Sequence, residues 1–225
     1  MKTNQRQSDC AYEQLKKMIV HMEIKPGSLV NETDLMERLG FGRTPLREAI
    51  LRLVEEKLIE IVPRRGYFIA DVSVTDITHA QEFRRYLECT SARLAAVRVT
   101  EQNDKDFDDF IEYAEQGMNT DDFIWHIETD REFHRLVAAA SGNPYLQESI
   151  DQMYNLTIRQ YYLSRTPMTL VRSEIEIYKF VIDAIKRHDS DEAELGMRTH
   201  LRFPRESDIS QNIKPIRNPI HPQSL

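Results

Sequence analysis

The stretch that decides the fold of this chain is VNETDLMERLGFGRTPLREAILRLVEEKLIEIVPRRGYFI, residues 30–69. Leu35 and Leu39 lie four residues apart, which predicts a short helix with one apolar face, and Asn31 can cap its N-terminus. The segment Gly40–Gly42 then predicts a tight turn, because glycine adopts backbone angles that other residues avoid. The first half of the stretch therefore predicts a helix that ends in a sharp turn.

A second helix and a hairpin follow this turn. Pro45 suits the first turn of a helix that starts near Thr44, where its missing N–H costs nothing. The apolar residues that recur at helical spacing in this helix are Leu46, Ile50, Leu53, Val54 and Leu58. Residues 59–62 and 67–69 alternate like two short strands on either side of a turn at 63–66. The order predicts a winged helix-turn-helix, a fold that places one helix in the major groove of DNA.

The motifs of this stretch resemble those of a known family. Residues 43–49 (RTPLREA), with 25–27 (KPG) upstream and 63–66 (PRRG) downstream, are similar in order and spacing to the GntR family of bacterial transcription regulators. The resemblance implies that the first third of the chain binds double-stranded operator DNA.

The expected DNA contacts lie on the second helix and at the tip of the hairpin. Arg43 and Arg47 are four residues apart and project from one helical face, where an arginine can bind guanine O6 and N7 or clamp a phosphate. Thr44 offers a hydroxyl to a phosphate at the helix N-terminus. The full set of expected DNA-binding residues is Thr33, Arg43, Thr44, Arg47 and, at the wing tip, Arg64, Arg65 and Gly66.

Two features of this surface qualify the expectation. The arginines could instead form surface ion pairs with Glu48, Glu55 and Glu56. The family usually has Ser or Thr at the position of Gly42, and the glycine can offer a phosphate only its N–H. We expect the missing hydroxyl to reduce the binding free energy by ~0.5–1.5 kcal/mol, the worth of one neutral hydrogen bond.

Length and composition are compatible with a DNA-binding protein of the bacterial cytoplasm. The chain has 225 residues, of which 40% are hydrophobic, and no apolar run approaches the ~20 residues of a membrane span. Cys10 and Cys89 form neither a disulfide framework nor a metal motif, which fits a reducing compartment. The net charge of −7 divides into 12 basic against 11 acidic residues over 1–72, and 18 against 26 over 73–225. The acidic excess therefore lies away from the predicted DNA-binding part.

The rest of the chain predicts helices and no strand of any length. A first helix covers about 9–21, and further helical patterns cover approximately 76–97, 101–117, 120–140, 144–164, 169–188 and 190–206. Six helices with short connections form an antiparallel bundle. The predicted fold is therefore mostly α: a winged helix-turn-helix over 9–72, an all-helical effector-binding and dimerisation domain over 76–206, and a flexible tail over 207–225.

This helical part resembles the FCD effector domain of FadR-like members of the GntR family. The motifs that carry the resemblance are EFRRYLE at 82–88, DREFH at 130–134, SGNP at 141–144 and MRTHL at 197–201. Six helices suit the smaller, VanR-like branch. The resemblance implies a homodimer that binds a small organic or sugar acid in the bundle, and most members repress transcription until such a ligand releases them.

A metal site is one reading of the bundle interior. Asp130 and His134 share the apolar stripe of their helix, and a buried carboxylate needs a partner or a metal. The resemblance implies that these two, His200 and a further histidine bind a metal, but this chain has Tyr178 at that fourth position. Three ligands can still hold one divalent ion, zinc or nickel, in an open site. Alternatively, the Tyr178 hydroxyl hydrogen-bonds His134 or His200 and leaves a metal-free pocket.

The expected effector contacts begin with Arg84. The resemblance places this arginine against the ligand, and a buried guanidinium calls for a carboxylate from Asp130 or from a bound acid. An ion pair with Glu88, four residues on, is the alternative. The other expected effector-binding residues are Tyr178, Asn155 and Arg159. Tyr154 and Tyr161 are further candidates, because the sequence does not fix which face of their helix lines the cavity.

Two further functions are alternatives to an effector-gated regulator. A metal-responsive regulator would use the ion itself as the signal, but the loss of a histidine at Tyr178 argues against it. A metal-dependent hydrolase would have no use for the first third of the chain and lacks a convincing general base beside Asp130, His134 and His200. We therefore expect no enzymatic activity.

Overall fold

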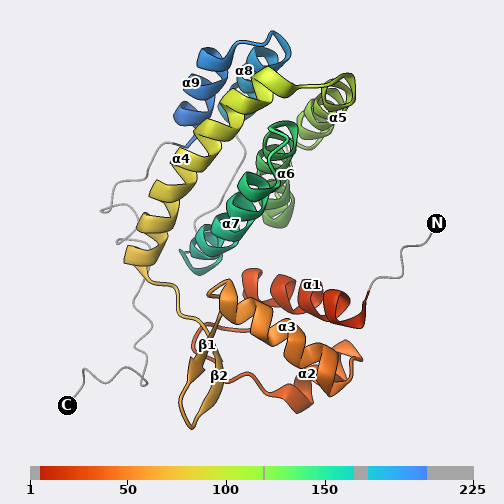
Figure 1. The fold of residues 1–225 in the computed structure, drawn as a ribbon, viewed down its shortest axis with the longest axis vertical. Helices are drawn as coiled ribbons and strands as arrows, with labels where there is room; N and C mark the ends of the chain where they lie inside the picture. Colours follow the sequence, from red (N-terminus) through yellow and green to blue (C-terminus); the bar gives the residue numbers. More distant parts are fainter. Residues whose placement is uncertain (1–5, 119, 165–171, 202–225) are drawn as a thin grey trace.

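A computed structural model describes residues 6–118, 120–164 and 172–201 of the chain (Figure 1). Along these ranges the helices follow the predicted order, with a two-stranded sheet between the third and fourth helix. The predicted tail over 207–225 and the end of the last predicted helix, 202–206, lie outside the described residues. No helix in the described ranges combines the length and the hydrophobicity that crossing a membrane requires.

The N-terminal unit is a three-helix core with a hairpin beside it. It contains α1 (Gln7–Val20), α2 (Glu32–Leu39), α3 (Arg43–Glu55), β1 (Ile59–Val62) and β2 (Gly66–Ile69). The strands are antiparallel, with Ile59 opposite Ile69 and Val62 opposite Gly66. The apolar residues predicted for α3 include Leu46, Ile50 and Leu53, all fully buried against α1.

Local signals explain where α2 begins and ends. The Asn31 side chain accepts hydrogen bonds from the N–H groups of Thr33 and Asp34, as its position before the helix predicts. The helix ends at Gly40, whose φ of 72° lies in the left-handed region that favours glycine. The predicted tight turn between the two helices is therefore present.

The C-terminal unit is a bundle built around one long helix. Its elements are α4 (Val74–Arg98), α5 (Glu101–Gly117), α6 (Phe123–Ala140), α7 (Pro144–Ser164), α8 (Arg172–Lys186) and α9 (Ser190–His200). Helix α4 packs against α9 and α8 on one side and against α6 and α7 on the other (Figure 1). Helix α6 begins at Phe123 and not near residue 120, because the Asp122 side chain caps the N–H groups of Ile124 and Trp125.

The two units share an apolar boundary. Ile127 of α6 and Tyr154 and Ile158 of α7 belong to the same buried cluster as the core of α1 and α3. At the same boundary the Arg159 guanidinium donates to the carbonyl oxygen of Ala70, just after β2, at 2.5 Å. The bundle therefore contacts both the helical core and the hairpin end of the N-terminal unit.

Candidate functional site

The N-terminus of α3 carries an exposed basic surface. Arg43, Thr44 and Arg47 are all exposed, and Gly42 is the N-cap residue in an extended conformation. Arg47 Nε donates to Glu32 of α2 at 2.9 Å, not to the glutamates of its own helix that the sequence offered as partners. Within the described residues Arg43 makes no hydrogen bond or ion pair. This surface can therefore meet an anion without first breaking a buried interaction.

The hairpin tip adds a second exposed basic surface. Arg64, Arg65 and Gly66 are exposed, and Arg64 and Gly66 have φ values of 65° and 108° that make the tight turn. The Arg65 guanidinium lies 5.4 Å from the centre of the Phe68 ring. Thr33 is also exposed, at the start of α2. All seven predicted DNA-binding residues therefore lie on the surface.

The predicted metal ligands converge in the bundle interior. Potential ligand atoms of Asp130, His134 and His200 lie within 4.8 Å of one another. His200 Nε2 is 3.1 Å from His134 Nε2 and 3.3 Å from Asp130 Oδ1. We call Asp130, His134 and His200 the acid–histidine cluster; it joins α6 to α9.

Two further carboxylates orient the imidazoles of this cluster. Glu88 of α4 contacts His134 Nδ1, and Glu174 of α8 lies 3.2 Å from His200 Nδ1. A carboxylate at Nδ1 favours the proton there and leaves Nε2 facing the cluster. Two facing Nε2 atoms at 3.1 Å repel each other unless a proton or a cation lies between or beside them. The cluster is therefore built to hold a positive charge.

Two tyrosines donate to the carboxylate of the cluster. Tyr178 donates to Asp130 Oδ1 at 2.8 Å, so the prediction that it would bond His134 or His200 is wrong. Tyr154 donates to Asp130 Oδ2 at 2.9 Å. Burial, followed by the charge of Asp130, raises the pKa of both hydroxyls well above the usual value. Both tyrosines are therefore neutral donors and poor metal ligands.

Arg84 faces the same interior from α4. Its Nε donates to Glu88 at 2.7 Å and its Nη1 donates to the Thr157 hydroxyl at 2.9 Å. Of the partners that the sequence allowed, Glu88 is the one that binds. Burial alone would raise the pKa of Glu88, but Arg84 and then His134 lower it to about 2. The pair is therefore ionised.

The charge state of the acid–histidine cluster also follows from the balance between burial and the neighbouring charged groups. Burial favours neutral Asp130, but His134 and His200 hold its pKa well below the usual value. Burial also opposes a charge on His200, yet hydrogen bonds to Asp130 and Glu174 raise its pKa to about 9. Without a metal, His200 therefore carries the positive charge that the cluster calls for.

The same donor set fits a divalent metal ion. Two imidazole nitrogens and a carboxylate are ligands that zinc and nickel accept, and three protein ligands are enough for an open site. Their Nδ1 partners, Glu88 and Glu174, supply the outer hydrogen bonds that metal-binding histidines usually have.

Two predicted effector contacts lie elsewhere. The Asn155 side chain contacts Asp151 and Arg131 at the boundary with α1, and Arg159 contacts the backbone of Ala70. Neither makes a described contact with the acid–histidine cluster. Tyr154, one of the further α7 candidates whose face the sequence left open, does contact the cluster. The apolar pattern of α7 does not show which face of the helix points into the bundle, so this contact could not be predicted from the sequence.

Comparison with protein families assigns most of the chain. Residues 7–69 match the family described as bacterial regulatory proteins, gntR family. Residues 79–203 match the family described as the FCD domain.

Relatives and solved structures agree with this assignment. The HTH-type transcriptional repressor RspR of Escherichia coli is 29% identical over 213 residues, covering 92% of this chain and 88% of the relative. The HTH-type transcriptional repressor NanR of Enterobacter sp. is 28% identical, covering 86% and 82%. The structure of E. coli McbR/YncC superimposes with a TM-score of 0.78 at 24% identity over 88% of this chain and 94% of that one, which shows a common fold. The chain is therefore a transcriptional regulator of the GntR family, with a winged helix-turn-helix DNA-binding domain followed by an FCD effector-binding domain.

Proposed function

We propose that this regulator is a repressor whose affinity for operator DNA changes when a small organic or sugar acid binds in its helical bundle. The observation that carries the proposal is the buried acid–histidine cluster inside the effector-binding domain, where potential ligand atoms of three residues converge within 4.8 Å. The charge on His200 is paired with Asp130 in this structure. An organic acid would bind by taking the place of Asp130, exchanging its hydration for this charge and for hydrogen bonds. The names of RspR and NanR, both repressors, support repression over activation.

The proposed DNA complex uses a homodimer. Two copies of α3 would enter successive major grooves of a pseudo-palindromic operator. Arg43 and Arg47 would bind bases or phosphates, Thr44 and Thr33 would bind phosphates, and the Arg64–Gly66 tip would approach the minor groove or its flanking phosphates. We further propose residues 9–72 and 76–206 as the limits of the two domains, and the bacterial cytoplasm as the place of action.

The proposed effector site has Arg84 and Tyr178 on its walls and the acid–histidine cluster at its base. Asp130, His134 and His200 would hold a zinc or nickel ion if one is bound, and that ion would supply a charge to bind the carboxylate of the effector. Arg84 already pairs with Glu88, so its role is to keep Glu88 ionised beside His134. Asn155 and Arg159 lie at the domain boundary, and we leave them out of the effector site.

Operator selection from random duplex DNA tests the first half of the proposal. We expect purified protein to enrich a pseudo-palindromic sequence, and Arg43→Ala with Arg47→Ala to abolish the enrichment. A library of organic and sugar acids is then screened for compounds that change the affinity for the selected DNA. Enrichment of no sequence above non-specific binding would sink the DNA-binding half, and no active acid would sink the effector half.

Metal content of protein purified without chelator decides what lies at the base of the site, with Tyr178→His as the matched variant. About one zinc or nickel ion per chain in the unchanged protein would mean that three side chains suffice. Metal only in Tyr178→His would mean that the tyrosine and the His200 charge replace the ion.

A metal-responsive regulator is the second candidate, and the convergence of three ligand atoms within 4.8 Å is the observation that favours it. In that case zinc or nickel alone would change the operator affinity, and organic acids would add nothing.

A further inference from the structure

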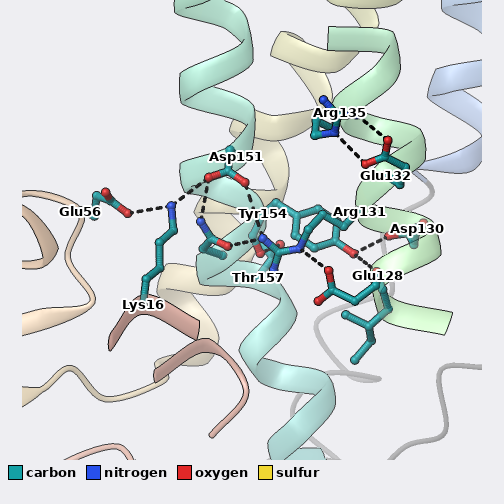
Figure 2. A network of polar contacts seen from close by, with 12 residues as sticks. Lys16, Glu56, Glu128, Asp130, Arg131, Glu132, Arg135, Asp151, Tyr154 and Thr157 are labelled. Atoms are coloured by element: carbon teal, nitrogen blue, oxygen red, sulfur yellow. Dashed lines mark hydrogen bonds and ion pairs between the residues drawn. The ribbon is translucent and has the colours of Figure 1, made fainter. Parts of the chain in front are cut away.

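A continuous chain of polar contacts leads from the acid–histidine cluster to the DNA-binding domain (Figure 2). Its first member is Tyr154, whose hydroxyl donates both to Asp130 Oδ2 at 2.9 Å and to the carbonyl oxygen of Ile127 at 3.0 Å. The hydroxyl has a single proton for two acceptors, so it can move toward either one. Tyr154 therefore responds to what Asp130 binds.

The ring of Tyr154 passes this response to charged groups. The guanidinium carbons of Arg84 and Arg131 lie 4.7 Å and 4.9 Å from the ring centre. Arg131 in turn donates to Asn155 Oδ1 at 2.8 Å and lies 3.6 Å from Asp151 Oδ1. A shift of the ring would therefore change its contact with Arg131 and, through Arg131, the contacts with Asn155 and Asp151.

The last contacts cross the domain boundary. Lys16 of α1 donates to Asp151 Oδ2 at 2.9 Å, and its Nζ lies 3.4 Å from Glu56 Oε2. Glu56 is the C-cap residue of α3, and Tyr12 of α1 also binds both Lys16 and Glu56. The Lys16 side chain is only 12% exposed, whereas that of Asp151 is 48% exposed, so the lysine is the buried half of this ion pair. Lys16 thus connects α7 to both helices that position the DNA-reading surface.

We infer that Tyr154, Arg131, Asp151 and Lys16 form a relay through which a change at Asp130 alters α1 and the end of α3. The inference rests on the proposed function, because it assigns the route by which a ligand in the bundle would act on DNA binding. The element with two positions is the Tyr154 hydroxyl, which can bind Asp130 and Ile127 together or Ile127 alone. A ligand that takes over Asp130 favours the second position.

Hydrogen exchange of the full chain, followed by mass spectrometry, tests the relay without knowledge of the operator or the effector. The perturbation is Asp130→Asn, which leaves one of the two tyrosine hydroxyls facing an amide donor. We expect it to change amide exchange in α1 (Gln7–Val20) by about threefold or more, the scale of a modest coupling. In an Asp151→Asn background, where Lys16 loses its partner on α7, the same change should disappear.

A matched control and a second perturbation keep the test decisive. Asp108→Asn breaks a comparable lysine–carboxylate pair, Lys186 with Asp108 at 2.6 Å, that links α8 to α5 far from α1. In that background the effect of Asp130→Asn on α1 should persist. Tyr154→Phe removes only the hydroxyl and replaces Asp130→Asn if the latter fails to fold. An unchanged α1 in response to either perturbation, or an equal response with and without Asp151, would overturn the relay.

The outcome is separable from the proposed function. If the relay operates but no acid changes operator binding, the proposed function fails and the relay stands. If an acid changes operator binding equally in the unchanged protein and in Asp151→Asn, the proposed function stands and the relay fails.

Discussion

The proposed DNA-reading surface, which carries Arg43, Thr44 and Arg47, and the bundle interior use arginine in opposite ways. Arg43 is exposed and without a described partner, and Arg47 has one exposed pair with Glu32. Arg84 is buried, and Glu88, Thr157 and the Tyr154 ring all contact its guanidinium. An exposed arginine stays available because its hydration and its weak pair are easily exchanged for a phosphate. A buried arginine cannot exchange its partners in this way, because removing a partner leaves a buried charge without compensation.

This comparison separates residues that decide function from residues that decide stability. Substitutions on the DNA-reading surface should change binding and leave folding nearly intact. Substitutions in the bundle interior should first cost folding free energy. Four substitutions test the distinction.

The largest effect is expected from Arg84→Met. The change leaves Glu88 buried with His134 as its remaining partner, so the free energy of unfolding should fall by ~3–5 kcal/mol. Urea denaturation followed by circular dichroism measures the change. Arg93→Met is the control, because Arg93 is exposed where it pairs with Asp191 and Glu194, so its loss should cost much less stability. Equal losses for both variants would erase the distinction between the two regions.

Arg47→Ala should reverse this pattern. We expect it to weaken operator binding by ~1–3 kcal/mol, as for an arginine that contacts a base. Its pair with Glu32 is exposed, so the free energy of unfolding should change by less than ~1 kcal/mol. Fluorescence anisotropy on the selected operator and urea denaturation give the two numbers. A loss of stability with unchanged affinity would mean that Arg47 serves the α2–α3 contact and not DNA.

Gly42→Ser should improve both properties by a small amount. A Cβ at this position would have Pro45 Cδ, at 3.9 Å, as its only described neighbour within 4 Å, and φ is −70°. The hydroxyl can cap α3, which adds a few tenths of a kcal/mol of stability. It can also bind a phosphate, worth ~0.5–1.5 kcal/mol of affinity. Gly40→Ser is the contrasting variant, since its φ of 72° makes a side chain cost ~1–2 kcal/mol.

Tyr12 gives the smallest and most specific effect, a dependence on alkaline pH. Burial and the bond to Glu56 raise the pKa of its hydroxyl from 10.0 to about 12. The protonated form is therefore favoured in the folded state, so this stability is complete below pH 10 and is lost as pH rises through about 12. Thermal denaturation between pH 9 and 12 should show a shallower decline for Tyr12→Phe than for the unchanged protein. Parallel declines would mean that Tyr12 does not hold α1 to the end of α3.

The sequence predicted those features that depend on neighbours along the chain. Apolar spacing placed the helices, and local caps such as Asn31 and Gly40 fixed their ends. The inward positions of Asp130 and His134 followed from one helical stripe. These features depend on interactions within a few residues, which periodicity records.

The features that the sequence left open depend on which helices meet. The sequence offered a histidine as one possible partner of Tyr178, but its hydroxyl reaches Asp130, because α8 presents it to α6 at that height. Helix α7 contacts α4, α6 and α1 at once, so buried residues occur around most of its surface. Apolar periodicity then cannot tell the face with Tyr154 from the face with Arg159. The role of each α7 residue had to come from the three-dimensional arrangement.

The hydrogen bond from Arg159 to the backbone beyond β2 has a mechanical consequence. Helix α7 is attached to the DNA-binding domain at two points, through Asp151 to Lys16 and through Arg159 to Ala70. Eight residues separate them, which is about 12 Å along a helix. A single attachment would let the domain rotate in any direction about that point. Two attachments restrict the rotation to the axis that joins them. A tilt of α7 would therefore carry the DNA-binding domain with it, and in the proposed dimer such a tilt would change the distance between the two recognition helices.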